Sequence, residues 1–599
     1  MSRTRRVAGL IAGPVVGLLV AGLIGSVSRP TPPSCAVHLS LVVSVEKLAQ
    51  MREISQAYAK KRVCADDPVR ISGGGPGSVL DGLADGWDPA EHAGLPRPDA
   101  WSPNADFSLG LLRLRAPETL ADEPVRSLNT TPMVLAIPRT VADALTKAFG
   151  EVTWQTVLDM AADPALWKQF SQGRWGPLRL GRTNPTLSTM GLQTLVAEFA
   201  HAAGVAKPAD LTAAAIADQG VRRRVEAIEA RVPHYGETTL DYLCNLARAD
   251  QRKQALGYVT VVPVEEKSVI EYNDGRQRDN QGGACPYRHA PAEKLVPLYP
   301  PDGVFVTGSP LAVLATADAD QRRLAADFAE FARSEAGQRI FRRDGFRDVS
   351  MRLDPHPATP GLVTRLSPRD LPPAPVIAAV RAAWDEVRRP ARILILLDMS
   401  GSMACSVDDQ RDGDHCAEPT DQRRQRFGLA RDAVAQALGG AALGSRDRVG
   451  LHTFGGPGPP CVDRTKGLVS AVDVAAVLPD ATEVGGETPL YRCLLAAQSW
   501  LAGRPDHAGY INAVVVLTDG ENDYANESLR TTAGKLAATY GGAAVRVFPV
   551  AYVYRELDPN LLTLAGAAGG TLYRANDPKA EETRPDNIAT VVRKLISAF

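Results

Sequence analysis

Hydrophobic residues in the second half of the chain come as short apolar runs separated by helical stretches. The runs RILILL at 392–397 and AVVVL at 513–517 have the unbroken apolar character of buried parallel strands. Strands are predicted at 392–397, 448–454, 513–517, 546–553 and 571–574, and helices at 424–438, 489–501, 528–540, 561–568 and 588–597. This alternation predicts a doubly wound α/β sheet with helices on both faces.

The first half also mixes strands and helices, with a less regular alternation. A strand at 37–45 runs into a helix at 46–61, and a second strand at 69–72 ends in a glycine-rich turn at 73–78. Helical patterns recur at 192–203 and 321–342. This half is therefore also expected to be α/β, as a separate domain.

Prolines crowd the segment between these halves. Seven fall within 355–375, a density that disfavours helix and central strand and favours an extended linker. The predicted divisions are an N-terminal segment at 1–34, a first domain at 35–350, a proline-rich linker at 351–389 and a second domain at 390–599.

The N-terminal segment has the pattern of a membrane anchor. Arg3, Arg5 and Arg6 precede an uncharged, largely apolar run at 7–27, and about 20 such residues span a bilayer. A cleaved signal peptide is the alternative, although only 26–28 approximates a cleavage site. Either interpretation places 35–599 outside the cytoplasm, membrane-anchored in the first case and secreted in the second.

Composition excludes two classes of protein. The 599 residues contain 67 Lys and Arg against 68 Asp and Glu, so no global basic field exists to bind nucleic acid. A hydrophobic content of 45% with 23% charged residues is typical of globular domains and excludes wholesale disorder.

Eight cysteines fit an exported protein. No C-x-x-C occurs, so the spacing does not indicate zinc or thioredoxin-like redox chemistry. Disulfides closing loops of this size add about 3 kcal/mol each, and buried free thiols are the alternative. Pairing neighbours in sequence predicts Cys35 with Cys64, Cys244 with Cys285, Cys405 with Cys416, and Cys461 with Cys493.

Candidate metal ligands follow the apolar runs of the second half. Asp398, Ser400 and Ser402 come directly after 392–397, Thr488 precedes a helix, and Asp519 follows 513–517. The carboxyl ends of parallel strands gather ligands at one edge of a doubly wound sheet. Hydroxyl and carboxylate oxygens suit a hard cation, so a Mg²⁺ site is predicted, with Ca²⁺ or Mn²⁺ as alternatives.

These residues, over roughly 390–599, resemble the von Willebrand factor A domain with its metal-ion-dependent adhesion site. The likeness rests on D-x-S-x-S at 398–402, the threonine Thr488 and the T-D-G turn at Asp519. It implies that the serines and the threonine hold the metal directly and that aspartates act through water. A coordination place would remain for a carboxylate of a protein partner. The alternative is a turn whose Ser and Asp side chains only cap a helix.

An acidic insertion distinguishes this sequence from a minimal domain of that type. It covers 404–422 and is flanked by Cys405 and Cys416. A second calcium site is the alternative, but position 12 counted from Asp408 is Pro419, which does not fit EF-hand spacing. A solvated, disulfide-pinned loop that shapes partner choice is the favoured interpretation.

The first half resembles bacterial extracellular solute-binding proteins of the two-lobed type that includes molybdate and sulfate binders. The likeness rests on 35–47, 131–138, 183–191 and 329–346. It implies two lobes with a ligand cleft between them. Ser44, Ser78 and Ser188 each stand near a strand-to-helix turn, where backbone N–H groups favour a small anionic solute. Ordinary helix capping is the alternative for each serine.

The favoured function is that of a membrane-anchored binding protein that engages an acidic group of a partner through the metal. The alternative is a solute-capture receptor of a transport or sensing system, with the second domain as docking module. No enzyme is expected. Ser400 and Ser402 have no adjacent histidine to activate them as nucleophiles. A metal chelatase subunit is also disfavoured, because chelatase relatives act together with an ATPase and this sequence contains no P-loop.

Overall fold

The computed structural model describes residues 35–89, 95–122, 126–280, 283–406, 425–439, 443–456, 459–479, 484–520, 522–523, 527–552, 559–575 and 588–597. The predicted anchor at 1–34 and most of the acidic insertion lie outside these ranges, and so does its Cys416. Across the ranges themselves, no helix combines the length and the apolar character that crossing a bilayer requires.

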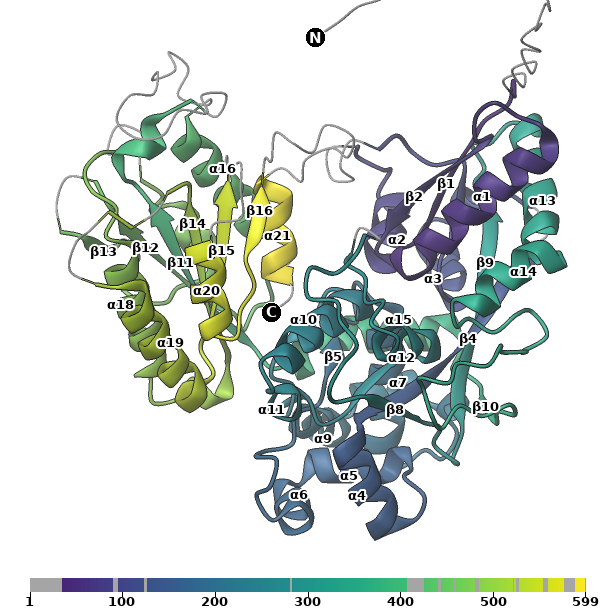
Figure 1. Cartoon of the computed structure of the whole chain (residues 1–599), viewed down its shortest axis with the longest axis horizontal. Helices are drawn as coiled ribbons and strands as arrows, with labels where there is room; N and C mark the ends of the chain where they lie inside the picture. The colour runs from purple at the N-terminus through teal and green to yellow at the C-terminus, as the bar shows by residue number, and fades with distance from the viewer. Residues whose placement is uncertain are drawn as a thin grey trace, which may run out of the picture.

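The first domain is built on an eight-stranded sheet in the order β2-β1-β3-β9-β4-β7, with β8 on β4 and β10 on β9. Its strands are β1 (Leu39–Ser44), β2 (Val69–Gly74), β3 (Ala100–Ser102), β4 (Arg126–Pro138), β7 (Val262–Glu265), β8 (Leu295–Leu298), β9 (Val304–Val313) and β10 (Pro368–Arg369). The long antiparallel strands β4 and β9 run between two groups of helices (Figure 1). The domain is therefore two-lobed, as the resemblance implied.

Lobe one surrounds β1, β2 and β3. Its helices are α1 (Leu48–Arg62), α2 (Pro76–Ala84), α3 (Phe107–Arg115), α13 (Ala319–Arg333) and α14 (Glu335–Arg343). Lobe two holds α4 (Arg139–Phe149), α5 (Trp154–Ala162), α6 (Pro164–Ser171), α7 (Thr189–Ala202), α8 (Ala213–Ala217), α9 (Gln219–Glu229), α10 (Thr239–Gln251), α11 (Ala255–Tyr258) and α12 (Glu266–Asn273). A short pair, β5 (Arg182–Thr183) and β6 (Tyr235–Gly236), completes lobe two.

The second domain has one six-stranded sheet in the order β13-β12-β11-β14-β15-β16, parallel except for β13. Its strands are β11 (Ala391–Asp398), β12 (Arg448–Phe454), β13 (Cys461–Asp463), β14 (Ile511–Thr518), β15 (Arg546–Tyr552) and β16 (Tyr573–Ala575). Its helices are α16 (Arg426–Gly439), α17 (Ala471–Ala475), α18 (Leu490–Ala502), α19 (Leu529–Ala543), α20 (Pro559–Ala567) and α21 (Ile588–Ser597).

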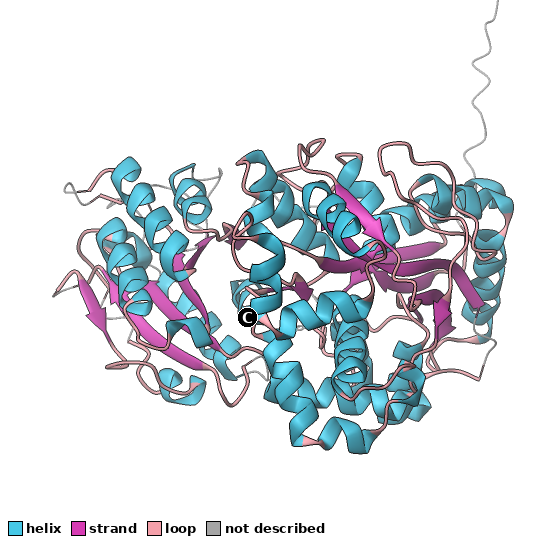
Figure 2. Cartoon of the chain, turned by 90° about the horizontal axis from the view of Figure 1, so that it is seen from below, coloured by secondary structure: helices cyan, strands magenta, loops and turns pink. Residues whose placement is uncertain are grey.

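Alternate residues of β11 supply both cores of this domain. Ile393 and Ile395 pack with α16 and α21 on one face, and Leu394 and Leu396 pack with α18 and α19 on the other. Helices accordingly cover both faces of the sheet (Figure 2). The predicted doubly wound fold is confirmed. The apolar runs predicted it because a strand that is buried on both faces carries apolar side chains along its length.

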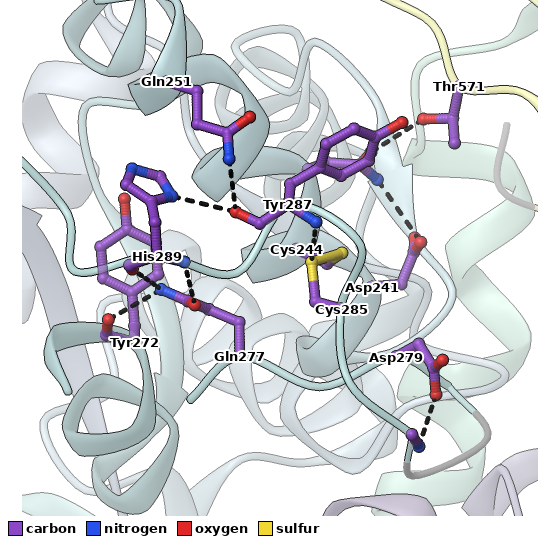
Figure 3. The surroundings of a disulfide bond; sticks show 12 residues. Asp241, Cys244, Gln251, Tyr272, Gln277, Asp279, Cys285, Tyr287, His289 and Thr571 are labelled. Carbon is purple, nitrogen blue, oxygen red and sulfur yellow. Dashed lines mark hydrogen bonds between the residues drawn. A yellow bond between two sulfur atoms is a disulfide. The ribbon is translucent and has the colours of Figure 1, made fainter. Parts of the chain in front are cut away.

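Three of the predicted disulfides are present: Cys35–Cys64, Cys244–Cys285 and Cys461–Cys493. The second of them is drawn in Figure 3. Cys405 is also disulfide-bonded, and no described cysteine is a free thiol. Because Cys416 lies outside the described residues, its pairing with Cys405 stays a prediction.

The proline-rich segment is not extended throughout. Residues 374–387 form helix α15 (Ala374–Val387), so the prediction of a helix-free linker is wrong there. Pro375 lies in the first turn, where the missing N–H and the fixed φ of proline suit a helix start. Ile377, Val380 and Ala383 recur at helical spacing and are buried. The prolines thus begin this helix, and its apolar face sustains it.

Helix α15 touches both lobes. It packs on α3 of lobe one and on α7, α8 and α9 of lobe two (Figure 1). Arg381 Nη2 donates to Asp81 Oδ2 at 2.8 Å in lobe one and to the Thr186 carbonyl at 3.0 Å in lobe two. Only 388–390 separate α15 from β11. The strand that ends in Asp398 therefore follows directly on a helix that spans the two lobes.

Candidate functional site

Two neighbouring parallel strands bring the predicted carboxylates to one edge of the second sheet. Asp398 is the last residue of β11, and Asp519 directly follows β14. The register pairs Leu397 with Leu517, so the two chain exits lie side by side. Both aspartates are buried, with exposures of 0% and 4%. The edge where they meet is the one at which doubly wound folds bind ligands.

Hydrogen bonds join the D-x-S-x-S turn to Asp519. The Ser400 and Ser402 hydroxyl oxygens lie 3.2 Å apart, and Ser402 Oγ donates to Asp519 Oδ1 at 2.9 Å. Asp398 Oδ1 accepts from the Ser400 N–H at 2.9 Å, and its Oδ2 accepts from Thr518 Oγ1 at 2.6 Å. Four of the five predicted ligand residues therefore form one connected cluster.

The fifth residue, Thr488, lies on a loop that is held against the same turn. The Gly485 N–H donates to the Met399 carbonyl at 2.8 Å, and the Gly401 N–H donates to the Gly486 carbonyl at 3.0 Å. Thr488 is 5% exposed, so it belongs to the buried part of this loop. The structure thus brings the loop that carries Thr488 to the cluster. Thr488 follows Gly486, which bonds to the D-x-S-x-S turn, by two residues.

The site contains polar residues that sequence reasoning missed. Arg426 Nη1 lies 2.6 Å from Asp519 Oδ2. Asp523 accepts from the Thr488 N–H, and Asn522 Oδ1 accepts from the Tyr491 N–H at 3.0 Å. Asn522 and Asp523 stand three and four residues after Asp519, a proximity that could have marked them. Arg426 carries no such signal, since it begins α16, far from both aspartates in sequence.

Burial and charge repulsion act together on Asp398. Desolvation, followed by the nearby Asp519 carboxylate, raises the pKa of Asp398 to about 7, against a usual value of 3.8. Arg426 pairs with Asp519 and not with Asp398. The ionised form of Asp398 therefore lacks a cation among the described side chains.

This shift predicts how the metal-free protein responds to pH. Between about pH 4 and about pH 7 the folded state holds a proton on Asp398 that the unfolded state releases, so stability falls as pH rises. In EDTA, the Tm of the second-domain transition should decline across this window by differential scanning calorimetry. Asp398→Asn, which stays neutral and isosteric, should flatten that decline. An equally steep decline in the variant would contradict this assignment.

The oxygens of the cluster fit a hard cation. Adjacent ligands of an octahedral Mg²⁺ at about 2.1 Å lie about 3.0 Å apart, close to the 2.9 and 3.2 Å separations of the hydroxyl and carboxylate oxygens here. No described group of three or more His, Cys, Asp or Glu side chains forms a metal cluster. A metal at this edge would therefore depend on Ser400, Ser402 and Thr488, together with the carboxylates.

The three serines predicted for a solute lie near the contact between the two lobes. At this contact the Gly77 N–H donates to the Leu187 carbonyl at 2.9 Å, and we name it the interlobe seam. Ser78 follows Gly77 and Ser188 follows Leu187. Ser44 pairs with Gly74 at the end of β1. Ser44 and Ser188 occupy N-cap positions, yet neither side chain makes a capping hydrogen bond. Ordinary capping therefore does not account for these two residues.

Sequence reasoning missed a buried charged group in the same region. Asn104 Nδ2 donates to Glu46 Oε2 at 2.8 Å, and across the lobes Lys267 Nζ donates to the Glu46 carbonyl at 2.7 Å. Burial, with Glu265 opposite, raises the pKa of Glu46 to about 7, and burial lowers the pKa of Lys47 to about 7. The seam thus holds charges of both signs and is not a purely positive site for an anion.

Two family models match this chain. The model described as "Bacterial extracellular solute-binding protein" matches residues 39–347, just over half of the chain. The model described as "von Willebrand factor type A domain" matches residues 393–521, which include all five predicted metal ligands. A search of curated proteins finds no match.

Solved structures resemble the two domains separately. A periplasmic binding protein from Actinobacillus pleuropneumoniae, with fructose-6-phosphate bound, is 12% identical at a TM-score of 0.39 and covers 59% of this chain and 98% of its own. A substrate-binding domain of a molybdenum transporter from Clostridium difficile is 13% identical at a TM-score of 0.30, covering 52% and 100%. The SpRpn10 von Willebrand A domain is 16% identical at a TM-score of 0.25, covering 34% and 93%.

Proposed function

Because the chain belongs to the bacterial extracellular solute-binding protein family and joins that domain to a von Willebrand factor A domain, we propose an extracytoplasmic, membrane-anchored binding protein. Its metal site engages an acidic side chain of a protein partner. The cluster of Asp398, Ser400, Ser402 and Asp519 at one sheet edge carries this proposal. The protein binds and performs no chemistry of its own.

The charge of the site supports a divalent cation that remains open to a partner. Two carboxylates face the cluster, and one of them is already paired with Arg426. The hydroxyls of Ser400, Ser402 and Thr488 are neutral, so a bound Mg²⁺ would keep net positive charge. Such an ion attracts an additional carboxylate, and a partner's Glu or Asp supplies one.

A test replaces Mg²⁺ by Mn²⁺ in the full chain and measures the longitudinal relaxation of water protons. Adding acetate as a carboxylate probe should lower the relaxivity, because acetate takes a place that water holds on the ion. Acetamide, of the same shape without the charge, should leave the relaxivity unchanged. An acetate titration without effect, with Mn²⁺ bound, would rule out carboxylate engagement at this metal.

A second candidate function is solute capture, with the A domain as docking module. Two hydroxyls at the ends of the neighbouring strands β1 and β3 favour it, because Ser44 and Ser102 are fully buried and their hydroxyl oxygens have no hydrogen-bond partner among the described residues. Buried hydroxyls are usually satisfied, and a small solute would satisfy these. Isothermal titration calorimetry of the full chain with small oxyanions tests this function, and measurable binding would support it. The Asp398→Asn variant should bind the oxyanion as the wild type does, because Asp398 lies in the other domain.

A further inference from the structure

A cavity of about 20 Å³ lies where lobe two meets the second domain. Its walls include His234, Asp241 and Arg248 from lobe two and Arg546 and Thr571 from the second domain. Thr571 Oγ1 donates to Asn245 Oδ1 at 2.8 Å across this junction, and Figure 3 shows Thr571 on the side of Asp241. The volume is enough for one or two water-sized particles.

Two arginines of this cavity are buried without carboxylate partners. Arg248 and Arg546 are only 5% and 4% exposed. The Nη1 atom of Arg248 has no hydrogen-bond partner, and its guanidinium lies 5.3 Å from the centre of the Tyr287 ring. Within the described ranges, no carboxylate lies within ion-pair distance of either guanidinium. A buried charge that is left unpaired is strongly unfavourable.

Neighbouring charges leave an excess of positive charge at this junction. Arg179 adds to the effect of burial in lowering the pKa of Arg546 to about 9. Arg252 bonds to the Gly566 carbonyl, which carries no charge. The opposing acids are Asp241, whose pKa burial and Glu237 raise to about 7, and Glu237 itself, which accepts from Asn280. Four guanidinium groups thus face two carboxyl groups, of which one is partly protonated near neutral pH.

A histidine adds a further donor. His234 is 7% exposed, and its Nε2 lies 2.7 Å from the Tyr258 hydroxyl. Its Nδ1 is buried and has no partner. In the tautomer that carries the proton on Nδ1, this atom is a donor without an acceptor, as Arg248 Nη1 is. The cavity wall therefore offers unused donors and positive charge in one place.

We propose that a monatomic anion of the size of chloride binds in this cavity, between Arg248 of lobe two and Arg546 of the second domain. The volume of about 20 Å³ suits one such ion. The anion would compensate the two guanidinium charges, one from each domain. It would thereby hold the solute-binding domain and the A domain together at this junction, independently of the metal site.

The test uses the full chain in two sodium salts of equal ionic strength, chloride and the bulky anion gluconate. Chloride should raise the Tm by about 2 °C or more, since an ion that binds only the folded state stabilises it. Arg546→Met should abolish this difference, whereas Arg530→Met, at an exposed position of α19 in the same domain, should keep it. Equal Tm values of the wild type in both salts would overturn the proposal.

A crystal of the wild-type chain grown in bromide gives a second measurement, which does not depend on whether a variant folds. Bromide scatters anomalously and replaces chloride. An anomalous peak in the cavity between Arg248 and Arg546 is expected. Density that refines as water there, without anomalous signal, would overturn the proposal even if Arg546→Met failed to fold.

Discussion

Mg²⁺ is expected to raise the Tm of the second domain by about 5–10 °C over EDTA, and Asp398→Asn should remove this rise. An ion at 100 times its Kd stabilises the folded state by about 2.7 kcal/mol, and a domain of about 200 residues gains about 2–4 °C per kcal/mol. The asparagine keeps the acceptor that the Ser400 N–H uses and loses the negative charge that a cation needs. Differential scanning calorimetry of both full-length proteins, with and without Mg²⁺, measures the effect.

Asp432→Asn is the matched control for this prediction. Asp432 lies exposed on α16 of the same domain, and among the described residues its ion-pair partner is its neighbour Arg431. This variant should keep the full Mg²⁺ response. A response of the same size in Asp398→Asn would show that the ion binds elsewhere, and the proposed function would then lose its site.

Gly77→Ala is expected to force the two lobes of the first domain apart. A Cβ atom at Gly77 would lie 1.8 Å from the Thr186 carbonyl oxygen and 2.7 Å from the Leu187 Cα, both backbone atoms of the opposite lobe. Because backbone cannot turn aside as a flexible side chain can, the interlobe seam must open. Overpacking of this kind costs about 1–3 kcal/mol. The Tm should fall, and the Gly77 amide should exchange faster once it loses the Leu187 carbonyl.

Gly257→Ala provides the control. Gly257 lies on α11 of lobe two, and an added Cβ there meets nothing within 4 Å. This variant should keep or slightly raise the Tm, because alanine is the better helix former. Hydrogen exchange and small-angle scattering should show the wild-type seam. An unchanged Tm together with slow exchange at position 77 in Gly77→Ala would contradict the closed contact.

Much of the second domain was predictable because its strands are buried on both faces. Runs such as 392–397 and 513–517 are typical of central parallel strands, and side chains that directly follow neighbouring parallel strands lie at one edge of the sheet. Arg426 was not predictable by that reasoning. Its contact with Asp519 depends on where α16 begins in space.

The proline-rich segment shows the opposite case. Proline density predicts extended chain, yet a proline in the first turn does not destabilise a helix. The five buried apolar residues of α15 pack against helices of both lobes. The sequence records those residues but not the surfaces that they meet. Glu46 and Glu265 were missed for the same reason, since charged residues are ordinarily exposed.

The amino-acid sequence by itself determined the alternation of strands and helices in the second domain, the presence of two domains, three of the cysteine pairs and the oxygen-bearing residues of the proposed metal site. Hydrophobic periodicity and the succession of elements along the chain depend on residues close in sequence, so both can be inferred from the sequence. Only the tertiary structure decided that α15 bridges the lobes, that Arg426 pairs with Asp519, and that Arg248 and Arg546 share a cavity. Each of these is a contact between residues distant in sequence, fixed by packing that no local pattern encodes.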